Sequence, residues 1–230
     1  MTVNALVFDM DDTLYEEKDY VRSGFKAIDR WINREFNITG FYETALDLFF
    51  SGETKFIFNK TLVRLNITYD DTLIKNLVDH YRSHEPDIHL LEDAKWILEN
   101  LRDTVKIGLI SDGYLVAQEK KVNALKLHEK FHSVILTDRL GREYWKPSHI
   151  PYEQASRELQ LPHDQCVYIG DNIKKDFLAA KRLGWTTIQI DRKDGLYSGI
   201  SAEHDYKAHF TIDSLKDLSD LPILKHMFAY

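Results

Sequence analysis

Three aspartates follow directly on an apolar run near the start of the chain, in the stretch LVFDMDDTL. A buried strand would not tolerate three carboxylates, so they are expected at its end. If the chain continues extended, Asp9 and Asp11 point to one side and Asp12 points elsewhere. Two converging carboxylates require a proton or a cation, and a hard divalent ion such as Mg²⁺ prefers oxygen ligands. A solvated turn, in which Asp12 or Thr13 caps a helix, is the alternative for this stretch alone.

A second acidic pair follows a later apolar run, in YIGDNIKKDFLAAKRLG. Asp171 stands at the predicted end of this strand, and Asp176 lies in the first turns of the helix that follows. Taken alone, the pair could be a helix start whose aspartates are favoured by the helix dipole. Reacting groups gather at the carboxyl ends of the strands in open α/β sheets. Two acidic pairs in such positions therefore favour a shared metal site.

Two further segments carry groups that could bind an oxyanion. LISDG ends another predicted strand with the hydroxyl of Ser111 and the backbone amides near Gly113. EYWKPSH contains Lys146, a positive charge on a stretch that the following proline stiffens. Each segment by itself is typical of an ordinary polar turn or surface loop. They gain meaning only from their positions relative to the acidic pairs.

In chain order, these segments resemble the motifs of the haloacid dehalogenase superfamily. DMDDT, a strand ending in serine, Lys-Pro and GDNIKKD occur in the family's order over residues 3–190. The tail HDYKAHFTIDSLKDL also resembles the final strand and helix of the phosphatase members. The resemblance implies a Mg²⁺-dependent phosphatase that hydrolyses a small phosphorylated metabolite, a sugar phosphate or a nucleotide. The reaction would pass through an aspartyl-phosphate intermediate.

The resemblance also implies a role for each residue. Asp9 would be the nucleophile, and Asp11 would protonate the leaving oxygen and then activate water. The implied catalytic residues are Asp9, Asp11, Ser111 and Lys146. The implied substrate-binding residues are Thr13, Ser111, Asp112, Gly113 and Lys146. The implied metal ligands are Asp9, Asp11 through its backbone carbonyl, Asp171 and Asp176.

Two positions depart from the common family pattern. Asp12 stands where many members have glycine, and Asp112 stands where asparagine is common. The second departure adds a negative charge near the expected phosphate. Members that dehalogenate or cleave phosphonates lack the second aspartate of the first motif, so the presence of Asp11 favours phosphate ester hydrolysis. A phosphosugar mutase of the same superfamily and a noncatalytic binding or regulatory protein on the same fold are the alternatives.

The elements that must position these residues are short apolar runs separated by helical stretches. Runs rich in β-branched residues and bounded by Asp, Gly or Ser predict buried parallel strands at 3–8, 105–110, 134–136, 166–169 and 186–190. Apolar residues at helical spacing predict helices at 92–102, 115–127, 151–160 and 173–183. In the tail we expect a surface loop at KDGLYSG, a short strand at HFTI and a closing helix at SLKDL. The alternation predicts the α/β class with a Rossmann-like parallel sheet.

One long interval interrupts this alternation. Nearly a hundred residues separate the first two predicted strands, and residues 16–86 have a mostly helical pattern. So long a crossover between neighbouring strands is unusual, which favours an inserted subdomain over extra helices packed on the sheet. The predicted domains are therefore a catalytic core of residues 1–15 and 87–230 and a helical cap of residues 16–86. The family inserts a cap at this point.

Composition limits the possible partners and location. The 37 acidic and 30 basic residues give a net charge of −7, which argues against binding to a nucleic-acid polymer. The single cysteine, Cys166, excludes an internal disulfide and a multi-thiol metal site. The opening MTVNALVFD lacks a signal-like pattern and no later run reaches membrane-spanning length, so we expect a cytoplasmic protein with no membrane partner. The sequence does not indicate an oligomeric state.

Overall fold

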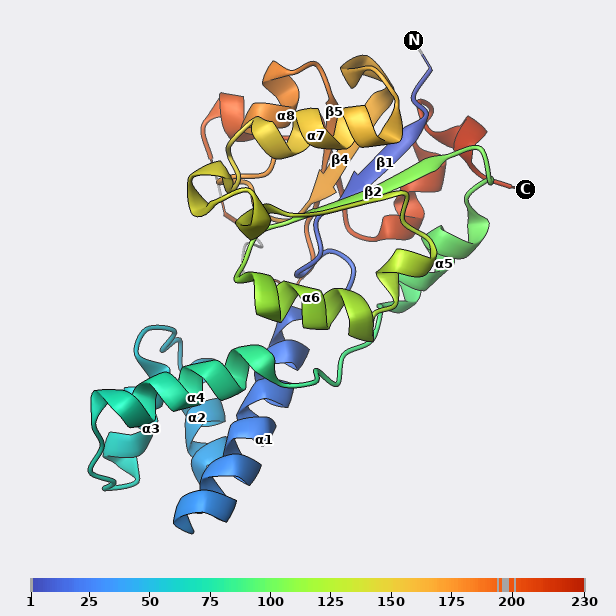
Figure 1. Ribbon diagram of the computed structural model, residues 1–230. Helices are drawn as coiled ribbons and strands as arrows, with labels where there is room; N and C mark the ends of the chain where they lie inside the picture. Colours follow the sequence, from blue (N-terminus) through green and yellow to red (C-terminus); the bar gives the residue numbers. More distant parts are fainter. Residues whose placement is uncertain (1, 194, 196–198, 201, 230) are drawn as a thin grey trace. The chain divides into compact units, whose positions relative to one another are not determined.

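The computed structural model describes residues 2–193, 195, 199–200 and 202–229 (Figure 1). The chain forms two compact units, one of Met1–Glu16 with His89–Tyr230 and the other of Glu17–Ile88. Most of the predicted loop at KDGLYSG lies outside the described residues. That the second unit acts as a cap stays a prediction.

A parallel sheet of six strands forms the centre of the first unit (Figure 1). The strands are β1 Ala5–Phe8, β2 Lys106–Ser111, β3 Ser133–Leu136, β4 Cys166–Gly170, β5 Thr186–Ile190 and β6 Phe210–Ile212. Their order is β3-β2-β1-β4-β5-β6, and every neighbouring pair is parallel. All residues of β1 and β4 are buried, which explains their continuous apolar sequences. The predicted α/β class with a Rossmann-like sheet is confirmed.

The register aligns the carboxyl ends of the central strands. Phe8, the last residue of β1, pairs with Leu109 of β2 on one side and Ile169 of β4 on the other. The backbone N–H of Asp9 then donates to the carbonyl of Ile169 at 2.8 Å. The residues that follow these strands therefore begin at the same edge of the sheet.

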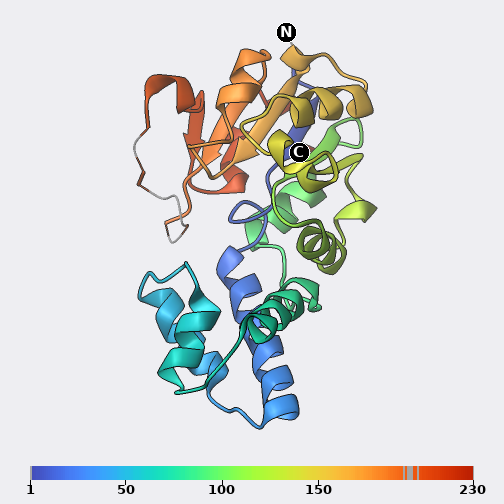
Figure 2. The same ribbon diagram turned by 60° about the vertical axis from the view of Figure 1, so that its left-hand side comes forward.

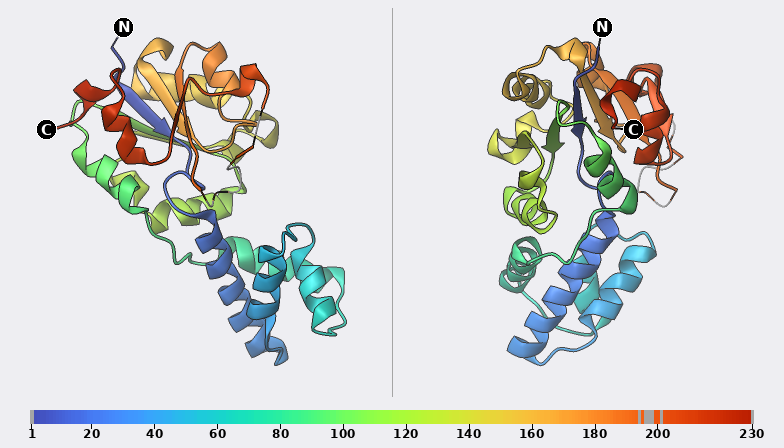
Figure 3. Two further views of the ribbon diagram at one scale, coloured as in Figure 1. Left: turned by 180° about the vertical axis from the view of Figure 1, so that it is seen from behind. Right: turned by 90° about the vertical axis from the view of Figure 1, so that its right-hand side faces the viewer.

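Helices cover both faces of this sheet. The α-helices are α5 Glu92–Asn100, α6 Leu115–Ala124, α7 Ile150–Leu159 and α8 Leu178–Arg182. Figure 3 (right) shows α6 and α7 on one side of the sheet and α5 with the C-terminal 3₁₀ turns on the other. Those turns are Leu215–Asp220 and Lys225–Met227; the earlier ones are Leu127–Glu129, Thr137–Arg139, Arg142–Tyr144, His163–Gln165 and His204–Tyr206.

Two predicted helices differ from the structure. The predicted helix at 173–183 begins only at Leu178, because side chains around Asn172 compete for the backbone N–H groups of the preceding turn. The predicted closing α-helix at SLKDL is a 3₁₀ segment of six residues. Ser214 and Asp217 form a capping box at its start, but the segment is too short to favour an α-helix.

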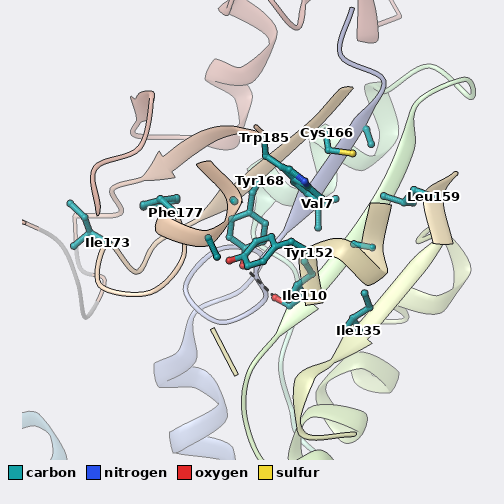
Figure 4. Packing of buried hydrophobic residues seen from close by; sticks show 14 residues of the cluster. Val7, Ile110, Ile135, Tyr152, Leu159, Cys166, Tyr168, Ile173, Phe177 and Trp185 are labelled. Atoms are coloured by element: carbon teal, nitrogen blue, oxygen red, sulfur yellow. Dashed lines mark hydrogen bonds between the residues drawn. The ribbon is translucent and has the colours of Figure 1, made fainter. Parts of the chain in front are cut away.

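A buried cluster joins one face of the sheet to α7 and α8 (Figure 4). The ring of Tyr152 on α7 meets Tyr168 of β4 edge to face at 5.0 Å between centroids and Trp185 at 5.7 Å. The hydroxyl of Tyr168 donates to the carbonyl of Ile110 at 3.4 Å. Cys166 is also buried in this cluster, as a small apolar residue. This packing fixes the strand ends that carry the aspartates.

The second unit is an assembly of helices with an aromatic core (Figure 2). Its helices are α1 Glu17–Phe36, α2 Phe41–Phe50, α3 Ile57–Arg64 and α4 Asp71–Ser83. Phe25 packs edge to face on Phe58 at 6.2 Å between ring centroids, and Phe58 packs on Tyr81 at 5.6 Å. Asp70 caps α4 by accepting a hydrogen bond from the backbone of Leu73 at 2.8 Å. No helix in the described part of the chain has both the length and the apolarity to cross a membrane.

Candidate active site

Three aspartates from two distant parts of the chain meet at the carboxyl edge of the sheet. Asp9 follows β1, Asp171 follows β4, and Asp176 lies in the turn before α8. One carboxylate oxygen of each lies within 4.8 Å of those of the other two, and all three residues are buried. The carboxylate of Asp11 is not part of this group. Of the predicted metal ligands, the structure therefore brings together the side chains of three.

The three carboxylates of the aspartate group repel one another, and the nearby positive charge does not fully offset this repulsion. The carboxylate of Asp171 accepts no hydrogen bond from the described residues, and burial together with Asp176 and Asp9 raises its pKa to about 9. Burial raises the pKa of Asp9 to about 6, although Lys146 opposes this shift. Carboxylate oxygens are the ligands that Mg²⁺ prefers, and a divalent cation would offset their repulsion. The residues present thus fit a magnesium ion.

Gly170 makes room for this arrangement. A Cβ atom at this position would lie 2.4 Å from Oδ2 of Asp176, too close for any side chain. The same Oδ2 accepts a hydrogen bond from the backbone of Asn172 at 2.9 Å. The other oxygen, Oδ1, is buried and accepts no hydrogen bond among the described residues, although the ammonium of Lys146 lies 2.9 Å away. An oxygen in this state is suited to a metal.

Lys146 places a completely buried ammonium group against the aspartates. Its Nζ donates to Oδ1 of Asp9 at 2.7 Å and to the hydroxyl of Tyr168 at 2.8 Å. Burial opposes the charge, but Asp176 and Asp9 outweigh it and raise the pKa of Lys146 well above 10.5. The peptide bond to Pro147 is cis. Lys146 is therefore a fixed positive charge in contact with the expected nucleophile.

Asp11 has a separate set of partners. Lys121, a buried residue of α6, donates to its Oδ1 at 2.6 Å, and Gln118 donates to its Oδ2 at 3.0 Å. The hydroxyl of Tyr15 donates to Oδ1 as well. Burial opposes ionisation, but Lys121 and these hydrogen bonds outweigh it and lower the pKa of Asp11 below 3.8. In this arrangement Asp11 is ionised and held in one orientation.

Ser111 ends β2 and Gly113 lies in the turn that follows, where the sequence predicts oxyanion binding. Ser111 is fully buried, and its Oγ accepts a hydrogen bond from Gln118 at 2.7 Å. Gly113 has a φ of 141°, and a Cβ there would lie 2.8 Å from the side chain of Gln118. Glycine is thus required both by the backbone and by the packing of Gln118.

Asp112 is held on both of its carboxylate oxygens. Oδ1 accepts from the hydroxyl of Thr137 at 2.8 Å and from the backbone of Lys146 at 3.1 Å. Oδ2 accepts from Nζ of Lys175 at 2.9 Å. Asp112 therefore links the turn after β2 to the segment that carries Lys146, and Lys175 balances its charge.

The loop that carries the first aspartates is anchored from behind by Arg192. Its guanidinium donates to the carbonyls of Asp12 at 3.1 Å and Thr13 at 2.6 Å and forms an ion pair with Asp93 of α5 at 3.0 Å. Asp12 has a φ of 50°, which explains why glycine suits this position. The hydroxyl of Thr13, expected to bind substrate, is buried and has no hydrogen-bond partner among the described residues.

Sequence reasoning missed the residues that hold the predicted ones. These are Gln118, Lys121, Lys175 and Arg192. Gln118 and Lys121 are three residues apart on the helix after Ser111, a spacing that places both on one face. That spacing is a signal that could have found them. Arg192 gave none, because its partners lie 99 and 180 positions away in the chain.

Comparisons with known proteins agree with this geometry. Residues 6–190 match the family model of the haloacid dehalogenase-like hydrolases. Glyceraldehyde 3-phosphate phosphatase from Methanocaldococcus jannaschii is 27% identical over 95% of this chain and 96% of its own. Pyrophosphatase PpaX from Bacillus cereus is 24% identical over 99% of both chains.

Several solved structures have a fold similar to that of this chain. The HAD-hydrolase YfnB from Bacillus subtilis, bound to magnesium, superposes with a TM-score of 0.69 and 15% identity over 96% of this chain and 99% of its own. A HAD phosphatase from Thermococcus onnurineus gives a TM-score of 0.61 and 21% identity over 95% of this chain and 97% of its own. At these identities the likeness concerns the fold.

Proposed function

This chain belongs to the haloacid dehalogenase-like hydrolases, and on that basis we propose that it is a Mg²⁺-dependent phosphatase acting on a small-molecule phosphate monoester through an aspartyl-phosphate on Asp9. The observation that carries the proposal is the buried group of Asp9, Asp171 and Asp176 with Lys146 in contact. Relatives named as phosphatases over nearly the whole chain support it.

The first half of the reaction would transfer the phosphoryl group to Asp9. A carboxylate oxygen of Asp9 attacks phosphorus, the bond to the ester oxygen breaks, and protonated Asp11 gives its proton to the leaving oxygen. Ser111 and the amides near Gly113 hold the phosphoryl oxygens, while Lys146 orients Asp9. Magnesium bound by the aspartates would supply the charge that offsets a phosphate dianion.

The second half would release phosphate and restore the enzyme. Asp11, ionised again, takes a proton from a water molecule that attacks phosphorus, and the bond between phosphorus and Asp9 breaks. The contacts of Asp11 with Lys121 and Gln118 suit this ionised state. Protonation for the first half must weaken the ion pair with Lys121.

The test measures phosphate release by variants in which Asp9 or Asp11 is replaced by asparagine. Asp9→Asn and Asp11→Asn should each lower turnover by about a thousandfold or more without unfolding the protein, because each removes a group that the chemistry uses. Asp103→Asn, at an exposed position, is the matched control and should retain activity. Wild-type turnover in either folded variant would refute the assignment.

The substrate class is open to a panel assay. Sugar phosphates, nucleotides, glyceraldehyde 3-phosphate and inorganic pyrophosphate should be compared for released phosphate with and without Mg²⁺. A phosphosugar mutase would instead yield an isomerised sugar phosphate with no free phosphate. A protein that hydrolyses none of them would fit the noncatalytic alternative. The cytoplasmic location stays a prediction, which cell fractionation can check.

A further inference from the structure

A second lysine, Lys175, stands beside the site on its solvent side. Its ammonium lies 2.9 Å from Oδ2 of Asp112, and its side chain is 30% exposed. The side chain of Lys146 is 0% exposed, and that of Asp112 is 4% exposed. Lys146 is therefore the inner cation, and Lys175 is the cation that a molecule in solution can reach.

Asp112 holds Lys175 in place. Its other oxygen is already occupied by Thr137 and by the backbone of Lys146, so the carboxylate has little freedom to turn. Burial opposes ionisation, but Lys146 and Lys175 outweigh it and keep the pKa of Asp112 below 3.8. The carboxylate is thus a fixed negative charge that directs the ammonium of Lys175.

The ammonium of Lys175 has hydrogen-bond donors to spare. An ammonium group carries three N–H donors, and within the described part of the chain Lys175 donates only to Asp112. The carboxylate of Asp112 lies 2.9 Å from the ammonium and favours its charged form. Lys175 is therefore charged, partly exposed and able to bind a further acceptor.

The two lysines near Asp9 differ in how far they reach solvent. Lys146 already contacts Asp9, where phosphorus must be attacked, and it is completely enclosed. Lys175 interacts with the charges of both Asp9 and Asp112, and its side chain is 30% exposed. Of these two lysines, Lys175 is the one that can contact a substrate group extending from the phosphoryl group toward solvent. A phosphate ester whose alcohol part is uncharged offers Lys175 no second anion to bind.

We propose that Lys175 binds a second anionic group of the substrate, a carboxylate or a second phosphate, located near the phosphoryl group that is transferred. This inference rests on the proposed phosphatase function and narrows its substrate class. The substrates favoured by this chain are phosphates with a second negative charge a few bonds from the reacting phosphorus. The Asp112–Lys175 pair is then a specificity device: Asp112 fixes the ammonium, and the ammonium selects the anion.

The experiment compares substrates that differ in the second anion alone. The closest pair is 3-phosphoglycerate, which has a carboxylate, and glyceraldehyde 3-phosphate, which has an aldehyde in its place. Inorganic pyrophosphate tests a second phosphate. Lys175→Met should lower kcat/KM for 3-phosphoglycerate or pyrophosphate about tenfold or more, mainly through KM, because a charge-assisted hydrogen bond is lost. For glyceraldehyde 3-phosphate the change should stay below about threefold.

Three further variants test the roles of the charge and of Asp112. Lys174→Met removes the same charge from an exposed neighbour. It should not change the ratio of kcat/KM between glyceraldehyde 3-phosphate and either 3-phosphoglycerate or pyrophosphate. Asp112→Asn removes the charge that fixes Lys175 and should lower the preference for the substrate with the second anion. The double variant Asp112→Asn with Lys175→Met should lose that preference. The ratio between two substrates on one protein sample does not depend on the fraction of folded enzyme.

Three outcomes would overturn the inference. An equal loss on all substrates after Lys175→Met would make Lys175 a ligand of the transferred phosphoryl group. If Lys175→Met lowers kcat/KM no more than the Lys174→Met control does, then Lys175 only positions Asp112. An Asp112→Asn variant with unchanged preference would show that the pair does not select the anion.

A binding measurement separates this inference from the proposed function. If the wild-type protein hydrolyses none of these substrates, the proposed function fails. Calorimetry of the wild-type protein with Mg²⁺ would then compare the binding of pyrophosphate with that of inorganic phosphate. A preference for pyrophosphate that Lys175→Met removes supports the inference, and equal binding of the two ions overturns it.

Discussion

Lys121 is the residue that most directly determines how Asp11 is held. It is buried on α6, and its ammonium contacts the carboxylate at 2.6 Å, while Gln118 bonds to the opposite oxygen. Neither side chain belongs to the aspartate group that fits a metal. In the proposed reaction, Lys121 would therefore act through Asp11 and not through the phosphate.

This geometry predicts a specific kinetic change for Lys121→Met. We expect kcat to fall about tenfold to a hundredfold with little change in KM, because the proton-transfer group loses its orientation while phosphate binding is kept. Lys121→Arg should recover much of the activity because it keeps the charge. Lys126→Met, at an exposed position, is the control. A variant that raises KM alone would contradict this role.

At the same scale, the sequence predicts the candidate reacting groups better than the groups that hold them. Asp9 and Asp171 are predicted to meet because each follows a recognisable apolar run, and Lys146 joins them through the family resemblance; the structure brings the three together. Lys121 and Lys175 were not predicted, since lysines on or near helices are usually solvated. Their burial depends on neighbours that are distant in the sequence.

Among the elements, α5 and the segment after β5 jointly support the loop that follows β1. Asp93, in the first turn of α5, accepts hydrogen bonds from Arg192 and from the backbone of Leu215 at 2.9 Å. Arg192 continues the connection to the carbonyls of Asp12 and Thr13. Three segments thus fix the backbone from which Asp9 and Asp11 project.

The connection predicts a pH-dependent stability difference for Asp93→Asn. Burial raises the pKa of Asp93, but Arg192 and Leu215 outweigh it, so the folded pKa lies below the unfolded value of 3.8. The stabilisation is therefore complete above 3.8 and is lost as the pH falls through the folded pKa. We expect the variant to lose about 2 kcal/mol of unfolding free energy at pH 7.

Urea unfolding at several pH values between 7 and 3 measures this difference. The gap between wild type and Asp93→Asn should narrow at the acid end. Glu92→Gln, at an exposed neighbour in the same turn, should leave no comparable gap. A gap that stays constant with pH would show that the charge of Asp93 is not its cause.

Elements were predicted well where the pattern is hydrophobic and poorly where local polar bonds decide. The strands of the central sheet follow from short apolar runs, and all of those predicted are present. The late start of α8 depends on bonds around Asn172 and Asp176 that no periodicity reveals. The closing segment Leu215–Asp220 is a 3₁₀ helix for a similar local reason, because it is short and begins with a capping box.

For the molecule as a whole, the aspartate group couples metal binding to folding. Without metal, burial and the neighbouring aspartates raise the folded pKa of Asp171 to about 9, far above its unfolded 3.8. Its ionisation therefore destabilises the folded state, and stability falls as the pH rises between these values. A cation that binds only the folded protein reverses this loss.

Thermal unfolding with EDTA and with Mg²⁺ checks the coupling. In EDTA at pH 8, Asp171→Asn should melt at a higher temperature than wild type, because it removes a disfavoured charge. With saturating Mg²⁺ the order should reverse: wild type gains about 2.7 kcal/mol at a hundredfold excess over Kd, and the variant gains much less. A wild-type melting temperature that does not change when Mg²⁺ is added would argue against the metal site.

The position of β1 in the middle of the sheet has a consequence for how the protein is made. Ala5 leaves the ribosome well before Lys106 and Cys166, the two residues with which it pairs. At ordinary elongation rates, its second neighbour emerges on the order of ten seconds or more later. During synthesis β1 therefore waits unpaired for strands that come much later, so a nascent chain interrupted before Cys166 carries Asp9 without the strand that holds it on one side.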